Sequence, residues 1–571
     1  MEVEEGERVH ARRWLASYPA SVAAEIGPER PRDLATLITR SCARNADRAA
    51  FTCLGVTIDY ATFETLCDAF AAWLAGLELP AGTRVAVMMP NILAWPVAAA
   101  GTLKAGMILV PVNPLYTARE LKHQLADSGA TVLVVMENFA HTFEAVAKET
   151  PVEHVCVASA GDCMGARGRL VDFVARHVKR MVPAWRVPGH VPFRAALEAG
   201  RKACREGRGA RAVPKPEDVA LLQYTGGTTG VAKGAVLTHA NIASNVAQNL
   251  SWLQSAFTSR REPRQLTYLC ALPLYHVFAL TVTLFTGIEH GTHIVLAPNA
   301  RDIGSLIAIL KRYPISVLPG LSTLFAAMLR HKGFDRINFS RLILTLGGGM
   351  ATEPDVAKRW QAVTGCAIAE GYGLSEASPV VSANRFDLTA FTGTIGVPLP
   401  STDIVVLDDA GCEMAAGERG EICVKGPQVM REYWKQPDET RAAFTENGYL
   451  RTGDIGMMAH DGTLTLIDRR KDMIVVSGFN VYPSEIEAVV CEHPGVRDAA
   501  AIAMPDAMSG EVVKLFVVAG DENLDEATIR AWCRERLTNY KRPRSIVFAN
   551  DLPRSALGKV LRRKLRTGEP A

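Results

Sequence analysis

Residues 219–239 read VALLQYTGGTTGVAKGAVLTH, and this stretch carries the strongest local signal in the chain. Its first six residues predict a strand, and six consecutive Gly or Thr residues follow at 225–230. Glycine permits positive φ, so the backbone N–H groups of such a loop can converge on phosphate oxygens. It is not a P-loop, because Gly234 rather than Ser or Thr follows Lys233. The candidate phosphate-binding residues are Tyr224, Thr225, Gly226, Gly227, Thr228, Thr229, Gly230 and Lys233, and a purely structural turn is the alternative.

The segments around this loop alternate between strand-like and helix-like patterns. Strands are expected at 267–272, 293–298, 315–320, 341–346 and 366–371, and helices at 302–313 and 354–363. Residues 80–136 repeat this style. Such alternation predicts a mostly parallel sheet covered by helices.

The pattern changes after about residue 393. Short strands with tight turns between them, such as the one at Asp461-Gly462, favour antiparallel structure. Beyond the charged run DRRKD (468–472), about 100 residues are enough for a small domain. The predicted fold class is therefore α/β. A large N-terminal body (1–470) would combine parallel α/β sub-lobes with a small β-barrel-like lobe, and a small mobile α+β domain (471–571) would follow.

Composition excludes several classes of protein. The 571 residues are 48% hydrophobic and 22% charged, which is typical of a globular protein and not of a disordered chain. With 63 Lys/Arg against 60 Asp/Glu, the net charge of +3 gives no reason to expect nucleic acid as a partner. Twelve scattered cysteines and a charged N-terminus predict a reduced, cytoplasmic protein. The longest apolar stretches, 92–103 and 277–288, are shorter than the about 20 residues of a membrane-spanning helix and are expected in the core.

Residues 161–211 form a basic segment within this balanced chain. It holds 12 Lys/Arg and 4 Asp/Glu, a net charge of +8, which leaves −5 for the remainder. Apolar residues recur in it at helical spacing: Leu170, Val171, Val174, Val178, Met181 and Val182. Two interpretations remain open, a solvated loop or a peripheral contact with the anionic inner face of a membrane.

Five elements in order resemble the signatures of the adenylate-forming enzymes, which include acyl-CoA synthetases, luciferases and adenylation domains. They are YTGGTTGVAKG (224–234), EGYGLSEASP (370–379), GYLRTGDIG (448–456), DRRKDMIVVSGFNVYPSEIE (468–487) and LPRSALGKVLRRKL (552–565). The second departs from the family pattern, with Ser375 where Thr is usual. The resemblance runs from about residue 33 to 565, and segments such as 111–125 are most similar to bacterial long-chain fatty-acid–CoA ligases.

This resemblance implies an ATP-dependent fatty-acid–CoA ligase. A fatty acid and ATP would give acyl-AMP and pyrophosphate, and CoA would then give acyl-CoA and AMP. ATP, Mg²⁺ and coenzyme A are the implied cofactors and co-substrates, and a homodimer is implied by the long-chain ligases. Three alternatives remain: an acyl-AMP ligase that loads a carrier protein, an aryl-CoA ligase, and a non-enzymatic membrane adaptor that binds lipid or nucleotide. The chain ends at residue 571 with no carrier domain, which favours the CoA ligase over the ligase that loads a carrier protein.

The resemblance also implies the nucleotide site. The fatty-acid carboxylate and the α-phosphate of ATP are both anions and repel, and Mg²⁺ held by hard oxygen ligands would offset that charge. Glu376 is the implied metal ligand, with Thr225 as a second one. Asp454 would accept the ribose hydroxyls, and Arg469 would reach the ribose or phosphate. The residues implied around adenine and the nearby phosphates are Gly349, Glu370, Gly371, Tyr372, Gly373 and Ser375.

Three further positions are implied for catalysis and gating. Lys559, in a loop before the last helix, would bridge the carboxylate and the α-phosphate, while Arg562, Arg563 and Lys564 beyond it look solvated. His276 would lie near the acyl carboxylate, in a pocket formed by 276–281, 318–323 and 346–349. The C-terminal domain would pivot at Lys471, and Gly478 would allow close approach of the pantetheine arm of CoA.

Overall fold

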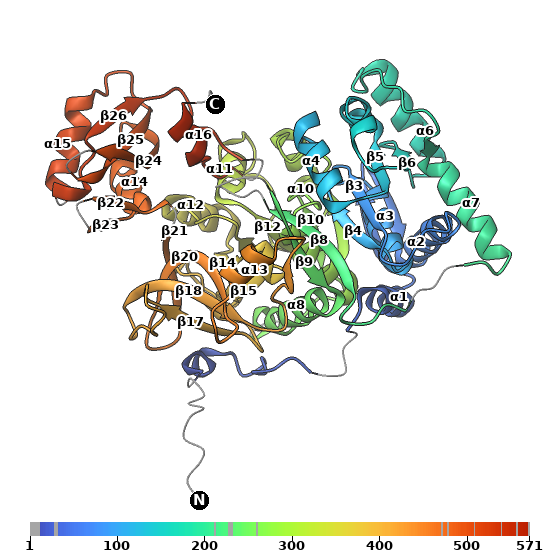
Figure 1. Cartoon of the computed structure of the whole chain (residues 1–571), viewed down its shortest axis with the longest axis horizontal. Coiled ribbons are helices and arrows are strands. Elements are labelled where there is room, and N and C mark those ends of the chain that lie inside the picture. Colours follow the sequence, from blue (N-terminus) through green and yellow to red (C-terminus); the bar gives the residue numbers. More distant parts are fainter. Residues whose placement is uncertain are drawn as a thin grey trace, which may run out of the picture.

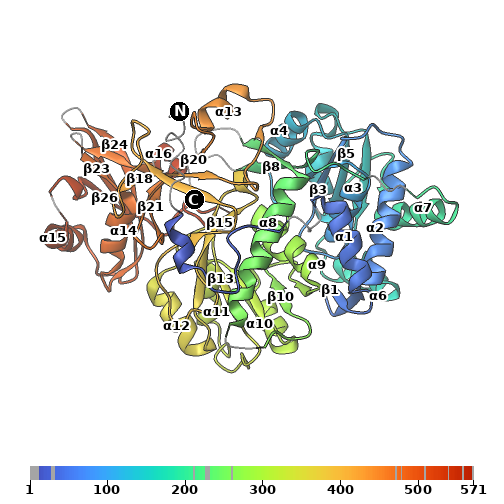
Figure 2. The same cartoon turned by 90° about the horizontal axis from the view of Figure 1, so that it is seen from below.

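The computed structural model describes residues 12–27, 32–209, 213–225, 232–258, 261–469, 472–476, 479–506, 509–537, 539–555 and 558–568. Over these residues the chain forms two large sheets, two smaller sheets and the helices that cover them. Figures 1 and 2 show α14, α15 and strands β22–β26 at one end of the molecule and α6 and α7 at the opposite end. The predicted α/β class, with a large body and a small C-terminal domain, is confirmed.

The first large sheet contains the strand that precedes the glycine-rich loop. Its strand order is β19-β9-β8-β4-β3-β5-β6-β7. Strands β8 to β7 in that order pair in parallel, whereas β9 and β19 add to the edge in antiparallel fashion. The strands are β3 (Arg84–Met88), β4 (Ile108–Pro111), β5 (Val132–Met136), β6 (His154–Ala158), β7 (Val191–Pro192), β8 (Val219–Thr225), β9 (Lys233–Thr238) and β19 (Glu432–Tyr433).

The second large sheet has the order β16-β15-β14-β13-β12-β10-β11-β1-β2. Its central strands from β14 to β1 are parallel, as the alternation of strands and helices predicts. The strands are β1 (Ala49–Cys53), β2 (Val56–Asp59), β10 (Thr267–Cys270), β11 (His293–Leu296), β12 (Val317–Gly320), β13 (Leu344–Gly347), β14 (Ile368–Gly373), β15 (Val380–Ala383) and β16 (Val397–Pro398).

Helices cover both sheets, and the largest hydrophobic core cluster draws residues from both. The helices are α1 (Leu34–Arg44), α2 (Tyr60–Ala75), α3 (Ala94–Lys104), α4 (Ala118–Ser128), α5 (Ala140–Glu144), α7 (Phe193–Arg205), α8 (His239–Leu253), α9 (Thr286–His290), α10 (Ile303–Arg312), α11 (Ser322–Arg330), α12 (Pro354–Thr364) and α13 (Pro437–Ala443). Local sequence sets their starts: Thr238 and Asn241 form a capping box that begins α8 directly after β9.

The two apolar stretches that the sequence places in the core are buried there. All of α3 is buried, and residues 279–285 form a buried π-helical segment, η6 (Ala279–Phe285), which continues into α9. Within the described part of the chain, no helix combines the length and the apolar character needed to span a bilayer.

A four-stranded antiparallel sheet occupies the place of the predicted β-barrel-like lobe. Its order is β17 (Asp403–Leu407), β18 (Arg419–Lys425), β20 (Leu450–Met458) and β21 (Leu464–Arg469). In the described residues β17 and β21 lie at opposite edges, so this sheet is open rather than closed. One face of the sheet packs on a core that includes Trp252 and Tyr372 from the large body. The sheet therefore buries its apolar face against the body and does not need to close into a barrel.

The C-terminal region has a sheet and a core of its own. Strands β22 (Ile474–Val476), β23 (Phe479–Val481), β24 (Val496–Asp506), β25 (Gly510–Ala519) and β26 (Ser545–Phe548) form the sheet. Helices α14 (Pro483–Cys491) and α15 (Glu526–Arg536) pack on it and contribute to its core, and α16 (Arg562–Thr567) ends the described chain. This is the α+β composition that the sequence predicts.

The basic segment contains the predicted helix, α6 (Ala166–Phe173), which continues as one π-helical turn, η4 (Val174–Val178). A buried carboxylate of the body, Glu137, pairs with Arg176 at 2.8 Å, and within the segment Arg194 pairs with the buried Asp162 at 2.7 Å. Burial raises the pKa of Asp162 to about 6. The backbones at Gly161 and Gly168 are so close that a Cβ on Gly161 would lie 2.0 Å from the Gly168 carbonyl oxygen.

Candidate active site

The candidate phosphate loop leaves a fixed strand pair. Strands β8 and β9 stay in register as far as Thr225, which lies opposite Lys233. Tyr224 is buried, and its hydroxyl donates to Asp127 Oδ2 at 2.5 Å, which ties the end of β8 to α4. Burial and this carboxylate raise the pKa of Tyr224, so the phenol remains a donor. The loop residues Gly226, Gly227, Thr228, Thr229 and Gly230 lie outside the described residues.

Lys233 begins β9 with its charge near two other groups. Its ammonium pairs with Glu439 of α13 and lies 5.3 Å from the ring centroid of Tyr433 on β19. The Glu439 side chain is 53% exposed. An ion pair this exposed contributes about 1 kcal/mol or less, so a phosphate group could replace the carboxylate at little cost.

Glu376 lies in the short helix η7 (Ser375–Ala377), directly after β14. Its Oε1 accepts the Tyr433 hydroxyl at 2.7 Å, and its backbone carbonyl accepts Met430 N–H at 2.7 Å. The helix η7 contacts both β8 and β9, so Glu376 lies beside the pair of strands that carries Thr225. Burial and the Glu376 carboxylate raise the pKa of Tyr433, which therefore remains a neutral donor.

The donor set here fits Mg²⁺ bound together with a nucleotide. Among the described residues there is no group of three or more His, Cys, Asp or Glu side chains placed to hold a metal ion by themselves. One carboxylate, Glu376, and one hydroxyl, Thr225, are available near the loop. Mg²⁺ usually takes one or two carboxylates, phosphate oxygens and water, which matches this set.

Tyr372 and Asp454 join the second large sheet to the four-stranded sheet. The Tyr372 hydroxyl on β14 donates to Asp454 Oδ2 on β20 at 2.6 Å, and both residues are buried. Thr452 Oγ1 accepts the Asp454 N–H at 3.1 Å, which fixes the backbone of the turn. Arg469 lies opposite Asp454 in the β20–β21 register, and its side chain is outside the description.

The residues around Tyr372 hold the backbone of the site. The Glu370 carboxylate accepts Thr352 N–H at 2.8 Å, and burial raises the pKa of Glu370. Gly373 leaves room for the neighbouring chain, because a Cβ there would lie 2.0 Å from the Pro379 carbonyl oxygen. One oxygen of Glu370 thus supports the turn after β13, and Ser375 opens η7.

The three segments predicted to form an acyl pocket lie together. A Cβ on Gly348 would lie 3.1 Å from the Phe278 ring and 3.1 Å from the Gly371 carbonyl oxygen. Gly349 has φ of +74°, and a Cβ there would lie 3.3 Å from Leu321. Segments 276–281, 318–323 and 346–349 thus meet at the carboxyl ends of parallel strands, where open α/β sheets bind ligands.

Lys559 reaches this place from the C-terminal region. Gly558, with φ of +77°, approaches α11 so closely that a Cβ would lie 2.7 Å from Thr323 Oγ1. Desolvation and the nearby charge of Lys559 lower the pKa of His276 to about 4. His276 Nδ1 accepts the Phe278 N–H at 3.3 Å, which leaves the proton of the neutral ring on Nε2. The structure therefore brings Lys559 and His276 together as a cation beside a neutral donor.

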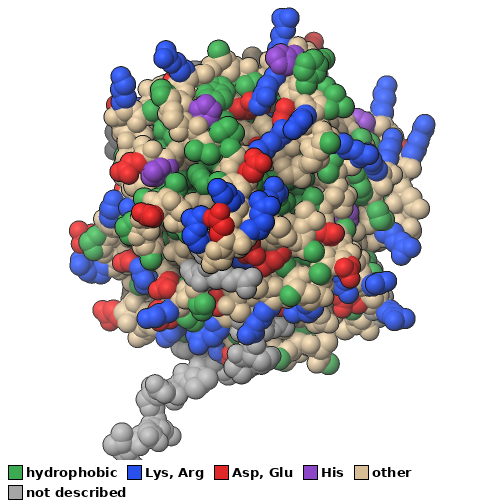
Figure 3. Space-filling view, turned by 90° about the vertical axis from the view of Figure 1, so that its right-hand side faces the viewer, with side chains coloured by type: hydrophobic (Ala, Val, Ile, Leu, Met, Phe, Trp, Pro, Cys, Tyr) green, Lys and Arg blue, Asp and Glu red, His purple; other side chains and the backbone are tan. Residues whose placement is uncertain are grey.

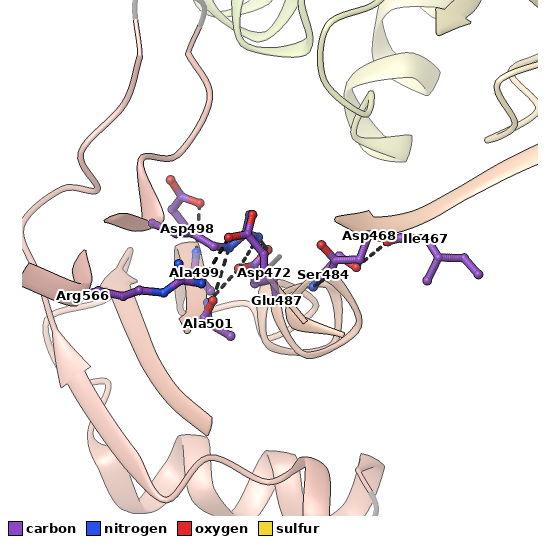
Figure 4. Close-up of polar contacts among 10 residues, drawn as sticks. Ile467, Asp468, Asp472, Ser484, Glu487, Asp498, Ala499, Ala501 and Arg566 are labelled. Carbon is purple, nitrogen blue, oxygen red and sulfur yellow. Dashed lines mark hydrogen bonds and ion pairs between the residues drawn. The ribbon is translucent and has the colours of Figure 1, made fainter. Parts of the chain in front are cut away.

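Polar contacts join β21, α14, β24 and α16, the helix that follows Lys559 (Figure 4). Arg566 pairs with Asp472 at 3.2 Å, Ala501 N–H donates to Glu487 at 2.7 Å, and Ser484 N–H donates to Asp468 at 2.9 Å. The expectation that Arg562 is solvated is wrong. Its side chain is 15% exposed and pairs with Glu487 at 2.8 Å, because a buried carboxylate on α14 needs a cationic partner.

Two predicted residues of the gating region, Lys471 and Gly478, lie outside the described residues. Conversely, sequence reasoning did not single out Tyr433, Asp127 or Glu439, whereas Thr323 was included as the end of a predicted pocket segment. The first three are linked to Glu376, Tyr224 and Lys233 across 57, 97 and 206 positions of the chain. The signal that could have found Tyr433 is the run EYWK (432–435), in which two adjacent aromatic residues stand between charged ones.

Comparisons with known proteins cover nearly the whole length of the chain. The AMP-binding enzyme family model matches residues 38–434, and the model of the AMP-binding enzyme C-terminal domain matches 485–559. A long-chain-fatty-acid–CoA ligase of Escherichia coli O157:H7 is 47% identical, covering 97% of each chain. A feruloyl-CoA synthase of Amycolatopsis sp. is 33% identical, covering 90% of this chain and 94% of that one. The ATP-bound MatB structure from Rhodopseudomonas palustris is 27% identical with a TM-score of 0.80, covering 94% and 98%.

Proposed function

The chain belongs to the AMP-binding enzyme family, and from that premise we propose that it is an ATP-dependent long-chain fatty-acid–CoA ligase. The carboxylate of the fatty acid attacks the α-phosphate of ATP to give acyl-AMP and pyrophosphate. The thiol of CoA then attacks the acyl carbonyl and releases AMP. One observation carries this proposal: near-complete coverage at 47% identity with a ligase of that name. The family membership confirms the resemblance that the five motifs predicted.

The nucleotide would lie between the strand pair β8–β9 and the Tyr372–Asp454 pair. We propose that Asp454 accepts the ribose hydroxyls and that Tyr372, oriented by its bond to Asp454, stacks on adenine with Gly349 and Gly371 at the base edge. Thr225, Lys233 and the glycine-rich loop between them would hold the phosphates. The bond of 2.6 Å between Tyr372 and Asp454 supports this arrangement, because it sets both side chains in one geometry.

Charge repulsion is the main obstacle to the first step. Two unit charges at 4 Å repel by about 4 kcal/mol at an effective dielectric near 20. Mg²⁺, held by Glu376 and Thr225, supplies charge neutralisation at the phosphates when bound. Lys559 would bridge the carboxylate and the α-phosphate, and neutral His276 would donate its Nε2 proton toward the carboxylate. The close approach of Gly558 to Thr323 supports this role for Lys559.

Replacement of Lys559 by alanine tests the assignment. Pyrophosphate release from fatty acid and ATP should fall by about 100-fold or more, since a charge aimed at the transition state is lost. Thioester formation from supplied acyl-AMP and CoA should persist. Arg563, which is exposed in the same basic stretch, gives the matched control Arg563→Ala with an unchanged rate. An unchanged rate of pyrophosphate release for Lys559→Ala would refute the role.

We also propose the division of the chain into a body (1–470) and a mobile C-terminal domain (471–571) with its hinge at Lys471. After adenylation the domain would turn, Lys559 would leave, and the pantetheine arm would enter near Gly478. The separate sheet and core of the C-terminal region support this division. Limited proteolysis with and without an acyl-AMP analogue tests it, and cleavage that ignores the ligand would count against it.

A second candidate is an aryl-CoA ligase, which the similarity to the feruloyl-CoA synthase favours. An AMP-release screen over fatty acids of increasing length and aryl acids, with CoA present, separates the two. Thioester formation only on a holo-carrier protein would instead identify an acyl-AMP ligase that loads a carrier. A homodimer, which the resemblance to the long-chain ligases implies, is proposed as well, and light scattering in solution tests it.

Finally, we propose that the basic segment contacts the surface of an anionic bilayer. Leu170, Phe173, Val178 and Met181 are 55 to 66% exposed and lie among Lys and Arg side chains. Figure 3 shows the end of the molecule that carries α6, where Lys and Arg side chains project between apolar ones. The ion pair between Arg176 and Glu137 holds the segment on the body, and the pairs of Arg194 with Asp162 and Asp172 fix the segment internally, so it can present this face without first ordering. Basic amphipathic helices bind bilayer surfaces in this way.

Vesicle sedimentation tests the bilayer contact. Binding to vesicles that contain phosphatidylglycerol should weaken as salt rises. Joint replacement of Leu170, Phe173 and Met181 by serine should weaken it by about tenfold or more, since each buried side chain contributes about 1 kcal/mol or more. Serine at Leu115 and Val363, which are exposed elsewhere, is the control. Equal binding after the triple replacement would identify the segment as a solvated loop.

A further inference from the structure

Residues 430–435 connect the two sides of the candidate active site. On one side this segment holds Glu376 twice. Met430 N–H donates to the Glu376 carbonyl at 2.7 Å, and the Tyr433 hydroxyl donates to the Glu376 carboxylate at 2.7 Å. The backbone and the side chain of the carboxylate residue are therefore fixed by the same short stretch of chain.

On its other side the 430–435 segment is bonded to the base of the phosphate loop. Arg431 N–H donates to Val236 O at 3.1 Å and Trp434 N–H donates to Gly234 O at 2.8 Å, both on β9. The Trp434 indole donates to the Asp127 carbonyl at 3.0 Å, and Asp127 also holds Tyr224. The loop strands and Glu376 are thus positioned relative to each other through this segment.

Tyr433 is the residue of this segment that faces both charges of the site. Its hydroxyl contacts Glu376, and its ring lies under the Lys233 ammonium at 5.3 Å from the centroid. Its one phenolic proton is directed at Oε1 of Glu376, so with respect to the described residues Oε2 is the oxygen that can take another partner. A carboxylate held in this way need not be ordered when a cation arrives, because the hydrogen bond has already restricted its rotation.

We propose that Tyr433 is a positioning residue that orients Glu376 toward the metal ion of the metal–nucleotide complex. This inference rests on the proposed function, in which Glu376 is the metal ligand. It assigns no catalytic role to Tyr433, whose hydroxyl is directed at the carboxylate and not at a reacting atom. Removal of that hydroxyl alone should therefore weaken metal binding and leave binding of the metal-free nucleotide unchanged.

Tyr433→Phe is the test variant, because it keeps the ring under Lys233 and removes only the hydroxyl. The probe is Mn²⁺ with α,β-methylene-ATP, followed by electron paramagnetic resonance. Loss of an outer-shell partner of a metal ligand usually costs about 10- to 100-fold in metal affinity, and a weakening of roughly tenfold or more is expected. Tyr449→Phe is the matched control, since Tyr449 also lies beside a lysine ammonium, that of Lys425 at 5.6 Å, but outside the site.

A further variant separates failure of this inference from failure of the proposed site. Glu376→Gln should abolish Mn²⁺ binding by the complex of the protein with α,β-methylene-ATP. Wild-type affinity of that complex for Mn²⁺ would refute the metal site itself. If Glu376→Gln loses the metal and Tyr433→Phe does not, the positioning role is wrong. A general loss of folding in Tyr433→Phe would weaken metal-free nucleotide binding in the same proportion, and that result would also overturn the inference.

Discussion

The close approach of Gly558 to Thr323 gives a prediction about the step that needs Lys559. Gly558 has φ of +77°, and a Cβ there would lie 2.7 Å from Thr323 Oγ1 and 3.2 Å from its Cγ2. We expect Gly558→Ala to disfavour the arrangement in which the C-terminal loop lies against α11. Formation of acyl-AMP should slow, because Lys559 reaches His276 only in that arrangement.

The magnitude has two parts. Alanine with positive φ costs about 1 to 2 kcal/mol wherever the loop lies. The overlap with Thr323 adds about 1 to 3 kcal/mol, as overpacking in a filled site does, and only when the loop is docked. Thr323→Ala removes both close atoms and leaves its Cβ at 3.4 Å, an ordinary contact. The second substitution should therefore recover about 5- to 150-fold of the lost rate.

The assay is the initial rate of pyrophosphate release from fatty acid and ATP without CoA. Thioester formation from supplied acyl-AMP should stay within about twofold of wild type, since the proposed second step does not use the docked loop. Gly568 supplies the matched control. It has φ of +71° at the end of α16, and a Cβ there would meet nothing within 4 Å, so Gly568→Ala carries the backbone cost without the overlap.

Three results would refute this reasoning. The first is a wild-type rate of pyrophosphate release for Gly558→Ala. The second is a slow Gly558→Ala enzyme that Thr323→Ala does not rescue, because the loss would then come from backbone strain and not from the contact with α11. A loss in Gly568→Ala equal to that in Gly558→Ala would lead to the same conclusion.

Three further predictions concern stability and nucleotide binding. Burial lowers the pKa of His239 to about 4, below the value of about 6.5 expected in the unfolded chain. The stability that this neutral histidine contributes is therefore lost as the pH falls from 6.5 toward 4. Between pH 7.5 and 5.5 the free energy of unfolding of the wild type, measured with urea, should fall by about 1.3 kcal/mol more than that of His239→Asn. Gly373→Ala should destabilise the protein by about 3 kcal/mol, because its Cβ would overlap the Pro379 carbonyl, and an unchanged urea midpoint would contradict this. Asp454→Ala removes the acceptor of the buried Tyr372 hydroxyl, so we expect the free energy of unfolding to fall by about 2 kcal/mol. ATP should also bind more weakly in calorimetry. Wild-type ATP affinity would exclude a role for Asp454 in the nucleotide site.

The sequence predicted those parts of the site that local chemistry determines. Neighbouring residues are enough to predict the Gly/Thr run after a strand, the Asp454 turn and the loop before the last helix. The structure places Tyr372 against Asp454 and Lys559 near His276. The alternation of strands and helices likewise predicted the parallel sheets, because buried parallel strands are apolar throughout.

The rest depends on contacts between distant parts of the chain. Tyr433 acquires its place only when a two-residue strand pairs with β9, about 200 positions earlier in the chain. Arg562 looked solvated within a basic run, and its partner Glu487 lies 75 positions away. In the basic segment the helical spacing was correct, but the contact between Gly161 and Gly168 depends on the fold of the loop before α6. No local pattern encodes such pairs.

The ends of the two large sheets limit how the protein can associate with itself. Strands β19 and β7 at the edges of one sheet and β16 at an edge of the other have only two residues each, and β7 and β16 contain proline. A proline cannot donate to a neighbouring strand, and a two-residue strand offers little backbone for a second chain to pair with. A buried, fully apolar strand such as β5 is thereby kept away from any free edge. Self-association through strand addition is blocked at three of these four sites.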